Sequence, residues 1–457
     1  MKNLISKLGP AKGNPRYASL PIFKLFSWSI LTTLLLFSCN NGDELRPEPI
    51  VTGDVTLLTQ ADVDDFGLTG VKEISGNLII GERFGLEASD LSSLTPLIGL
   101  EEIGGDLRIF STALTNLQGL NDLKRINGDL EIHGNDELQA LDHMAGLQQI
   151  NGIFTFSFNP NIHNLSAFDG LSGVGIFRIR QNNSLESLFD MQNNELARIE
   201  ISNNPNLETL PGIFPKQIAS LTISANNRLV SLKGLENTAQ INRLRLWTNE
   251  GLTSLEGLEN LKHVPDTMEI RSNSQLINFD GMGMLETGPE YVDITNNRKL
   301  RSIDRFKIRS ESKGAFVAII GNWELQGLEP LLGLETMELL TLSGNFELTN
   351  IRDLRDLKEL MSLQIAGHFE LASLEGLENL ESVDNLYIDG NDLLTNLNAL
   401  SGLGEVAKRL VIKRNTALTD LCAIQSLISS GGPETLEMEN NAFNQSRDDF
   451  LTGNCSN

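Results

Sequence analysis

The chain has 457 residues, of which 40% are hydrophobic, and its formal net charge is −24. Residues 1–38 hold five Lys or Arg and no Asp or Glu, which leaves 31 basic against 60 acidic residues, a net charge of −29, in residues 39–457. Phosphate contacts need a net basic surface, so this balance excludes nucleic acid as an expected partner.

The N-terminal 38 residues have the pattern of an export signal, because basic residues precede an apolar run at 26–37. The run ends in Leu36-Phe-Ser-Cys39, which resembles the lipobox of bacterial lipoproteins. We therefore predict a signal peptide at 1–38 and lipid attachment at Cys39. A signal anchor or an incidental cysteine is the alternative, but the run is shorter than the ~20 residues of a membrane span.

Residues 39–50 are polar and contain two prolines, which predicts a flexible tether. Its acidic start resembles the surface-export signals of Bacteroidota lipoproteins, and this resemblance implies a lipid-anchored protein on the cell surface of the outer membrane. Residues 51–75 follow as an expected N-terminal cap. In it a strand-like segment precedes Thr59, which is placed to cap an acidic helical turn and so to close a free strand edge.

Residues 76–418 are built from copies of one unit, which is clearest at 128–141. In each copy an Asn follows an alternating pair of apolar residues, and neighbouring anchors are 22 to 26 residues apart. The anchors are Asn135, Asn159, Asn182, Asn204, Asn226, Asn249, Asn273, Asn297, Asn322, Asn345, Asn391, Asn415 and Asn441, with His368 once in place of Asn. Such a period over most of a chain indicates a solenoid.

Each position of the unit has a physical role. In Leu130-Glu-Ile132 the alternation buries two side chains and exposes one, which predicts a short strand, and successive strands would stack in parallel about 4.8 Å apart. The Asn amide can bond turn backbone that is otherwise buried without partners, so stacked Asn residues form a ladder. Gly146 and Gly152 would stand at corners where a Cβ collides.

This consensus resembles the receptor L-domain of growth-factor receptors and related microbial surface proteins. The resemblance covers roughly residues 51–457 and implies a mainly β fold: a right-handed parallel β-solenoid, similar to leucine-rich repeats, of about 15 coils in one elongated domain with capped ends. It implies no ligand motif, because binding surfaces differ within this family.

Residues 419–457 depart from the repeat and are expected to form a C-terminal cap. With Cys39 assigned to lipid, Cys422 and Cys455 are the two remaining cysteines and both lie in this cap. Exported proteins usually avoid free thiols, so a Cys422–Cys455 disulfide is expected, with two free thiols as the alternative.

No motif of a P-loop, zinc protease, nucleophile elbow or calcium nonapeptide is present in the sequence, and the five histidines lack partners at metal-ligand spacing. Ser310-Glu-Ser-Lys313 matches a Ser-x-x-Lys pattern that recurs by chance. We therefore expect no enzyme, no metal and no cofactor.

The outward positions of the predicted strands form columns on one exposed sheet. A basic patch with one aromatic residue is expected from Arg178, Arg180, Arg198, Arg243, Arg245, Arg271 and Trp247, and an adjacent apolar patch from Tyr291, Phe316, Ala318, Ile320 and Leu339. The alternative is that the arginines pair with Glu200 and Glu269 along the sheet.

These features favour non-catalytic recognition of a protein or glycan partner through the exposed sheet. Because aromatic residues are 6% of the chain, a sugar site dominated by stacking is less favoured than a protein partner. The alternatives are a structural spacer or surface-layer component and, third, a carbohydrate-active β-solenoid enzyme.

Overall fold

The computed structural model describes residues 49–83, 89–191, 198–210, 214–308 and 314–456. The predicted signal peptide, Cys39 and nearly all of the tether lie outside these ranges, as does the whole of Ser310–Lys313. Residues 48–457 form one compact unit.

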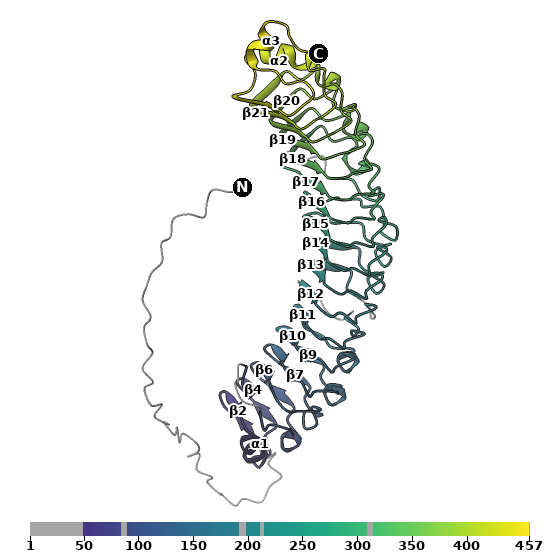
Figure 1. Ribbon diagram of the computed structural model, residues 1–457. Helices are drawn as coiled ribbons and strands as arrows, with labels where there is room; N and C mark the ends of the chain where they lie inside the picture. Colours follow the sequence, from purple (N-terminus) through teal and green to yellow (C-terminus); the bar gives the residue numbers. More distant parts are fainter. Residues whose placement is uncertain (1–48, 84–88, 192–197, 211–213, 309–313, 457) are drawn as a thin grey trace, which may run out of the picture. The chain divides into compact units, whose positions relative to one another are not determined.

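Within the described residues the main sheet contains seventeen strands. Each strand pairs in parallel with the next strand of this sheet along the chain (Figure 1). They are β2 (Val55–Leu57), β4 (Leu78–Gly81), β6 (Leu107–Phe110), β8 (Leu130–His133), β10 (Ile153–Ser157), β11 (Ile176–Arg180), β12 (Arg198–Ser202), β13 (Gln217–Ser224), β14 (Gln240–Trp247), β15 (Thr267–Arg271), β16 (Tyr291–Thr295), β17 (Phe316–Ile320), β18 (Thr336–Ser343), β19 (Glu359–Ala366), β20 (Ser382–Asp389), β21 (Glu405–Lys413) and β22 (Thr435–Glu439). This ladder of about sixteen turns confirms the parallel β-solenoid expected from the repeat.

A second parallel sheet is confined to the first coils and consists of two-residue strands. They are β1 (Ile50–Val51), β3 (Glu73–Ile74), β5 (Glu102–Ile103), β7 (Arg125–Ile126) and β9 (Gln149–Ile150). A glycine corner separates these strands from the main sheet, and a Cβ on Gly152 would lie 2.2 Å from the Asp129 Oδ1 atom. At Gly146 a Cβ would lie 2.8 Å from the carbonyl oxygen of Asn121, so both expected tight corners are present.

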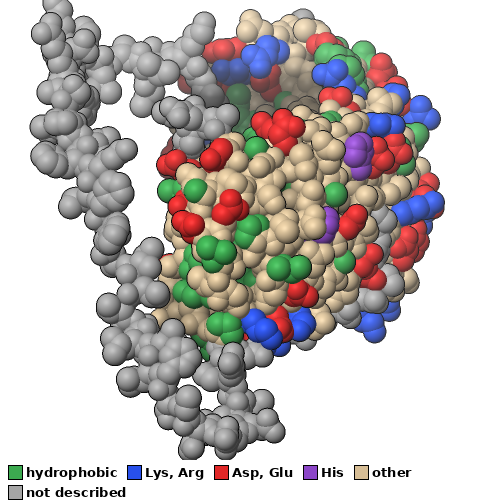
Figure 2. All heavy atoms as spheres, turned by 90° about the horizontal axis from the view of Figure 1, so that it is seen from below, with side chains coloured by type: hydrophobic (Ala, Val, Ile, Leu, Met, Phe, Trp, Pro, Cys, Tyr) green, Lys and Arg blue, Asp and Glu red, His purple; other side chains and the backbone are tan. Residues whose placement is uncertain are grey.

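Helical segments are short and connect the strands. They are α1 (Gln60–Gly67), α2 (Gln425–Ser429), α3 (Arg447–Leu451) and the 3-10 turns η1 (Thr95–Leu97), η2 (Asp142–Met144), η3 (Ser166–Phe168), η4 (Glu329–Leu331), η5 (Arg352–Leu354), η6 (Asn398–Leu400) and η7 (Cys422–Ile424). At α1, Thr59 is the N-cap and forms a capping box with Asp62, while Val63 is buried. Viewed from the α1 end, acidic and basic side chains are interspersed over that face (Figure 2).

The core is a continuous column of inward Leu, Ile and Phe side chains, because the alternation along each strand buries every second residue. Phe154, Phe168, Phe177 and Phe189 pack together with ring centroids 4.8 to 5.9 Å apart. Each coil therefore buries its apolar face on its neighbours, as a linear stack requires.

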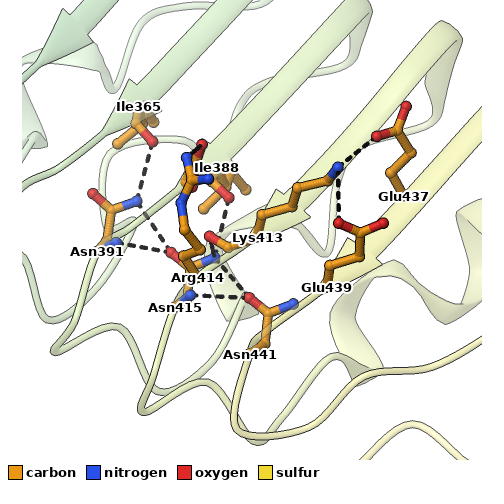
Figure 3. A network of polar contacts seen from close by, with 10 residues as sticks. Ile365, Ile388, Asn391, Lys413, Arg414, Asn415, Glu437, Glu439 and Asn441 are labelled. Carbon is orange, nitrogen blue, oxygen red and sulfur yellow. Dashed lines mark hydrogen bonds and ion pairs between the residues drawn. The ribbon is translucent and has the colours of Figure 1, made fainter.

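The predicted asparagine ladder is present, and every anchor from Asn135 to Asn415 is fully buried. At most steps the backbone N–H of one Asn donates to Oδ1 of the next, at 2.9 to 3.2 Å, and its Nδ2 donates to a strand carbonyl of the preceding coil. Figure 3 shows these bonds at Asn391, Asn415 and Asn441. Thr112 ends the ladder at one side and Asn444 at the other.

The residue directly before each ladder position has a positive φ, between 48° and 70°, a feature that the sequence analysis missed. Glycine occupies this left-handed position at Gly134, Gly321, Gly344, Gly367 and Gly390. The other coils place larger residues there, including Phe158 and Gln181, at φ 57° and 56°. The turn therefore points these side chains away from the buried Asn.

His368 interrupts the ladder. Its backbone N–H still donates to Asn391 Oδ1 at 3.2 Å, and its Nδ1 donates to the carbonyl oxygen of Asn345 at 3.0 Å. Its ring offers no oxygen to the N–H of Asn345, and its buried Nε2 has no hydrogen-bond partner among the described residues. Burial lowers the pKa of His368 below its ordinary value, which favours the neutral form of the ring.

Replacing His368 with Asn should raise the free energy of unfolding by about 1 kcal/mol, since it restores an acceptor for a buried N–H. The gain should grow as the pH falls below about 6.5, the ordinary histidine pKa, because the unfolded chain then binds a proton that folded His368 resists. Denaturant unfolding of both proteins at pH 5.5 and 8 measures this. If wild type and the His368→Asn variant have the same free energy of unfolding at both pH values, His368 is not a weak point of the ladder.

The C-terminal cap is closed by a disulfide between Cys422 and Cys455, which confirms the expected pairing. The Leu421 N–H also donates to the carbonyl oxygen of Cys455 at 2.9 Å. Phe450 of α3 is buried in the cap. The last residues thus cover the open end of the core.

Candidate partner-binding face

The register of the main sheet produces the outward columns expected from the sequence. Arg178 lies between Thr155 and Glu200 on the neighbouring strands, and Arg245 lies between Thr222 and Glu269. Trp247 is next to Arg271. The candidate residues on β11–β15 therefore share one exposed face of the sheet.

Around Trp247 the arginines belong to an ion-pair network. Glu269 binds Arg245 Nε at 3.2 Å and Arg271 Nη2 at 3.1 Å, and Arg271 also lies 2.8 Å from Asp293. The two guanidinium groups are 5.9 and 5.7 Å from the centre of the Trp247 ring. Burial alone would lower the pKa of Arg271, but the carboxylates of Asp293 and Glu269 outweigh it and the pKa is raised. The positive charges of the two arginines are therefore balanced by the two carboxylates in this part of the face.

Arg180 and Arg243 also have acidic partners. Arg180 pairs with Glu200, and Arg243 Nε lies 3.6 Å from Asp266, where both side chains are about half exposed. The alternative, in which arginines pair with Glu200 or Glu269 along the sheet, is therefore what the structure shows for Arg180, Arg245 and Arg271. The Arg243 pair, exposed to water, contributes little.

Arg178 and Arg198 differ from these residues, because their side chains make no ion pair or hydrogen bond within the described part of the chain. They line a groove of about 460 Å³ over β8–β12. Its polar and charged lining is Arg83, Asp129, Glu131, Thr155, Arg178, Arg180, Arg198 and Glu200.

The acidic residues of this groove have partners already. Glu131 lies 2.8 Å from Arg83, Glu200 pairs with Arg180, and Asp129 Oδ1 accepts the backbone N–H of Ile153 at 2.7 Å. The groove therefore presents two guanidinium groups with unused donors. Arg83 follows β4 and joins the site from outside the strand columns, so the outward-position pattern did not find it.

Tyr291 and Phe316 lie side by side on β16 and β17, and their exposed fractions are 38% and 37%. Leu339 of β18 is the next residue in that column. The structure therefore brings the predicted apolar residues together, on the strands that follow the Trp247 network.

A stack of aromatic rings outside the sheet was also missed. Trp323, Phe346 and Phe369 each follow a ladder position, with neighbouring centroids 5.6 and 4.6 Å apart and nearly parallel rings. Arg298 lies 4.3 Å from the Trp323 centroid. Because neighbouring rings stack face to face, they pack successive turns together, while Trp323 and Phe369 at the two ends of the stack are 40% and 48% exposed.

Within the described ranges no group of three His, Cys, Asp or Glu side chains is arranged to hold a metal ion. His133 Nδ1 lies 2.9 Å from Ser157 Oγ and His263 Nδ1 3.1 Å from Thr287 Oγ1, which are structural contacts between neighbouring coils. Burial and the charge of Arg83 lower the pKa of His133. None of the described helices has the length and apolar content needed to cross a bilayer.

The strand ladder and the buried asparagines define the chain as a parallel β-solenoid. It is similar to the solved structure of a leucine-rich-repeat protein from Leptospira interrogans, with 16% sequence identity and a TM-score of 0.30, over 82% of this chain and 94% of that one. The register of the strands defines the fold independently of this likeness. No protein-family model and no curated protein sequence matches the chain.

Proposed function

We propose that this chain is a non-catalytic recognition protein that binds a protein or glycan partner through the exposed sheet, and that Arg178 and Arg198 bind anionic groups of that partner. The observation that carries the proposal is the pair of guanidinium groups with unused donors in one groove. A guanidinium fork matches the geometry of carboxylate, sulfate or phosphate oxygens.

The proposal favours Arg178 and Arg198 over Arg245, Arg271 and Trp247, which the sequence pattern weighted equally. An anion that approaches Arg245 must compete with the carboxylate of Glu269. Glu269 is only 8% exposed and already forms an ion pair with Arg245. In contrast, Arg178 and Arg198 lose only water when they bind. Tyr291 and Phe316 would provide apolar contact for a partner large enough to extend along the sheet.

A spacer or surface-layer component is the second candidate and would bind no discrete ligand. An enzyme of the carbohydrate-active type is the third. Its groove would require a general acid and a base or nucleophile with free carboxylates, whereas Glu131, Glu200 and Asp129 are engaged by Arg83, Arg180 and the Ile153 N–H. This engagement supports recognition over hydrolysis.

We further propose that the protein is related to receptor L-domain proteins and is displayed on the outer membrane through lipid on Cys39. The repeat consensus and the lipobox-like sequence support this, and the Cys422–Cys455 disulfide fits an oxidising compartment. The intact mass of the membrane-derived protein tests it: we expect a chain that begins at Cys39 and carries acyl groups. A mature chain with residues 1–38 attached would refute the anchor.

The recognition proposal predicts that the full chain binds an anionic polymer, with heparin and polygalacturonate as probes, or a protein captured from outer-membrane extracts. Replacing both Arg178 and Arg198 with Ser should weaken binding by about tenfold or more, since each guanidinium contributes charged hydrogen bonds. Biolayer interferometry of the purified proteins measures the affinity.

The matched control removes the same two charges elsewhere, at Arg301 and Arg352, which are exposed and paired with Glu324 and Glu375. Those substitutions should leave binding within about twofold. If both double variants lose the same amount of affinity, the loss reflects the change in net charge, and the proposed site at Arg178 and Arg198 is wrong. Wild-type protein that captures none of these probes or extract proteins would favour the spacer.

A further inference from the structure

A second groove, of about 390 Å³, lies at the carboxyl ends of β10–β13. Its lining consists of four carboxamide residues and three apolar residues: Gln181, Asn183, Asn203, Asn227, Phe158, Pro205 and Ala225. It contains no charged lining residue, in a chain of net charge −24. The proposed anion groove and the Trp247 network contain several charges each.

The ladder explains why these side chains face outward together. Buried Asn182, Asn204 and Asn226 bond to backbone inside the coil, and the residues on either side of each one leave the turn toward solvent. Gln181 and Asn203 precede ladder residues, at φ 56° and 55°, while Asn183 and Asn227 follow them. Stacking the coils then aligns these side chains in two adjacent columns.

The hydrogen-bonding capacity of the four carboxamides is unused. None of their side chains bonds to another group in the described ranges, and each provides two N–H donors and one acceptor oxygen. Phe158 is 43% exposed at the end of the groove, with one edge contact to the His133 ring at 5.0 Å. The groove thus combines neutral donors and acceptors with an exposed aromatic ring.

We propose that this groove binds a neutral glycan chain. The carboxamides would donate to and accept from sugar hydroxyls, and Phe158 would contact the apolar C–H face of a sugar ring. The uncharged lining gives no counterion for a phosphate or carboxylate. This inference goes beyond the proposed anion site, because it concerns a different groove and a ligand of different chemistry.

A peptide added as an extra strand fits the groove less well. Such a peptide needs free backbone groups at its docking edge. At this turn the N–H groups of Phe158, Gln181, Asn203 and Ala225 already donate to carbonyl oxygens of the next coil, at 2.9 to 3.2 Å. Recognition must therefore use side chains, which suits a ligand rich in hydroxyl groups.

Two of the four carboxamide residues, Gln181 and Asn203, have a left-handed backbone, so glycine can replace them without strain. Glycine accepts this conformation better than either residue, so the double variant Gln181→Gly and Asn203→Gly should fold at least as well as wild type. The matched control is Ser272→Gly with Asn296→Gly. These residues have φ 58° and 60° in coils outside the groove.

The test measures binding of the full chain to neutral polysaccharides, with dextran, laminarin, galactomannan and xylan as probes, by affinity electrophoresis and calorimetry. At least one should bind, the groove variant should bind about tenfold more weakly, and the control should bind like wild type. The Arg178 and Arg198 double variant should also retain this binding, which separates the two sites. The inference is overturned if wild type binds none of the four, or if groove variant and control bind equally.

Discussion

Replacing Asn273 with alanine should lower the free energy of unfolding by about 3–5 kcal/mol, because it leaves several buried groups without partners at once. The backbone N–H and Nδ2 of Asn249 donate to Asn273 Oδ1 at 3.0 and 3.3 Å. The Nδ2 of Asn273 donates to the carbonyl oxygens of Leu246 and Arg271, at 2.9 and 3.2 Å. Alanine provides none of these bonds, and the site is fully buried.

The matched control is Ser274→Ala, one residue further along the same turn and partly exposed. It should change stability by less than about 0.5 kcal/mol. Denaturant unfolding followed by circular dichroism measures both variants. If Asn273→Ala is as stable as its control, the ladder does not stabilise the coil stack in the way described.

Removing the disulfide with Cys422→Ser and Cys455→Ser should destabilise the C-terminal cap by about 3–4 kcal/mol, since the bond closes a loop with a sequence separation of 33. The cap covers the end of a stack in which each coil contacts only its neighbours. We therefore expect the loss to be local. The strands β21 and β22 should open more often, while β4, β6 and β8 should be unaffected.

Hydrogen exchange read by mass spectrometry distinguishes these regions. In the variant, protection should fall in 405–456 and stay the same in 78–133. A reductant added to wild type should reproduce the pattern. Unchanged protection of the cap would contradict the stabilising role of the bond, and a uniform loss across the chain would contradict a stack of locally coupled coils.

Much of the fold could be predicted from the sequence, because the same pattern of inward apolar residues and buried Asn recurs in nearly every coil. The Asn after each apolar pair had to bond backbone inside the turn, and the structure places each of these anchors in the ladder. Thr59 before an acidic segment predicted a capped helical turn, and two cysteines in a non-repeating end predicted a disulfide. In each case a local pattern is sufficient, since the partners lie on the same or the next coil.

The candidate site could be predicted only in part. The columns of outward residues follow from strand register, but which arginine is paired depends on the reach of each side chain toward two neighbouring coils. Arg245 and Arg271 both bind Glu269, whereas Arg178, directly beside Glu200, leaves that carboxylate to Arg180. The sequence of a single coil therefore does not indicate which arginine pairs with which carboxylate.

Two further features escaped the sequence analysis for different reasons. The low aromatic content, 6% of residues, was used only to disfavour a sugar site dominated by stacking, and the column that contains Trp323, Phe346 and Phe369 was not noticed. The left-handed residue before each Asn was also missed, although five glycines share that position and would have revealed it. Aligning every column of the repeat, including the turns, finds both.

The most direct test of recognition through Arg178 and Arg198 is to follow the side-chain Nε–H signals of the arginines by nuclear magnetic resonance while a heparin oligosaccharide is added. The structure provides an internal comparison, because Arg245 and Arg271 are held by Glu269 and Asp293 on the same sheet. The account predicts that the signals of Arg178 and Arg198 shift together at the lowest concentrations, while those of Arg245 and Arg271 remain in place. Shifts at Arg245 and Arg271 without any at Arg178 and Arg198, or no shift at any of the four, would contradict it.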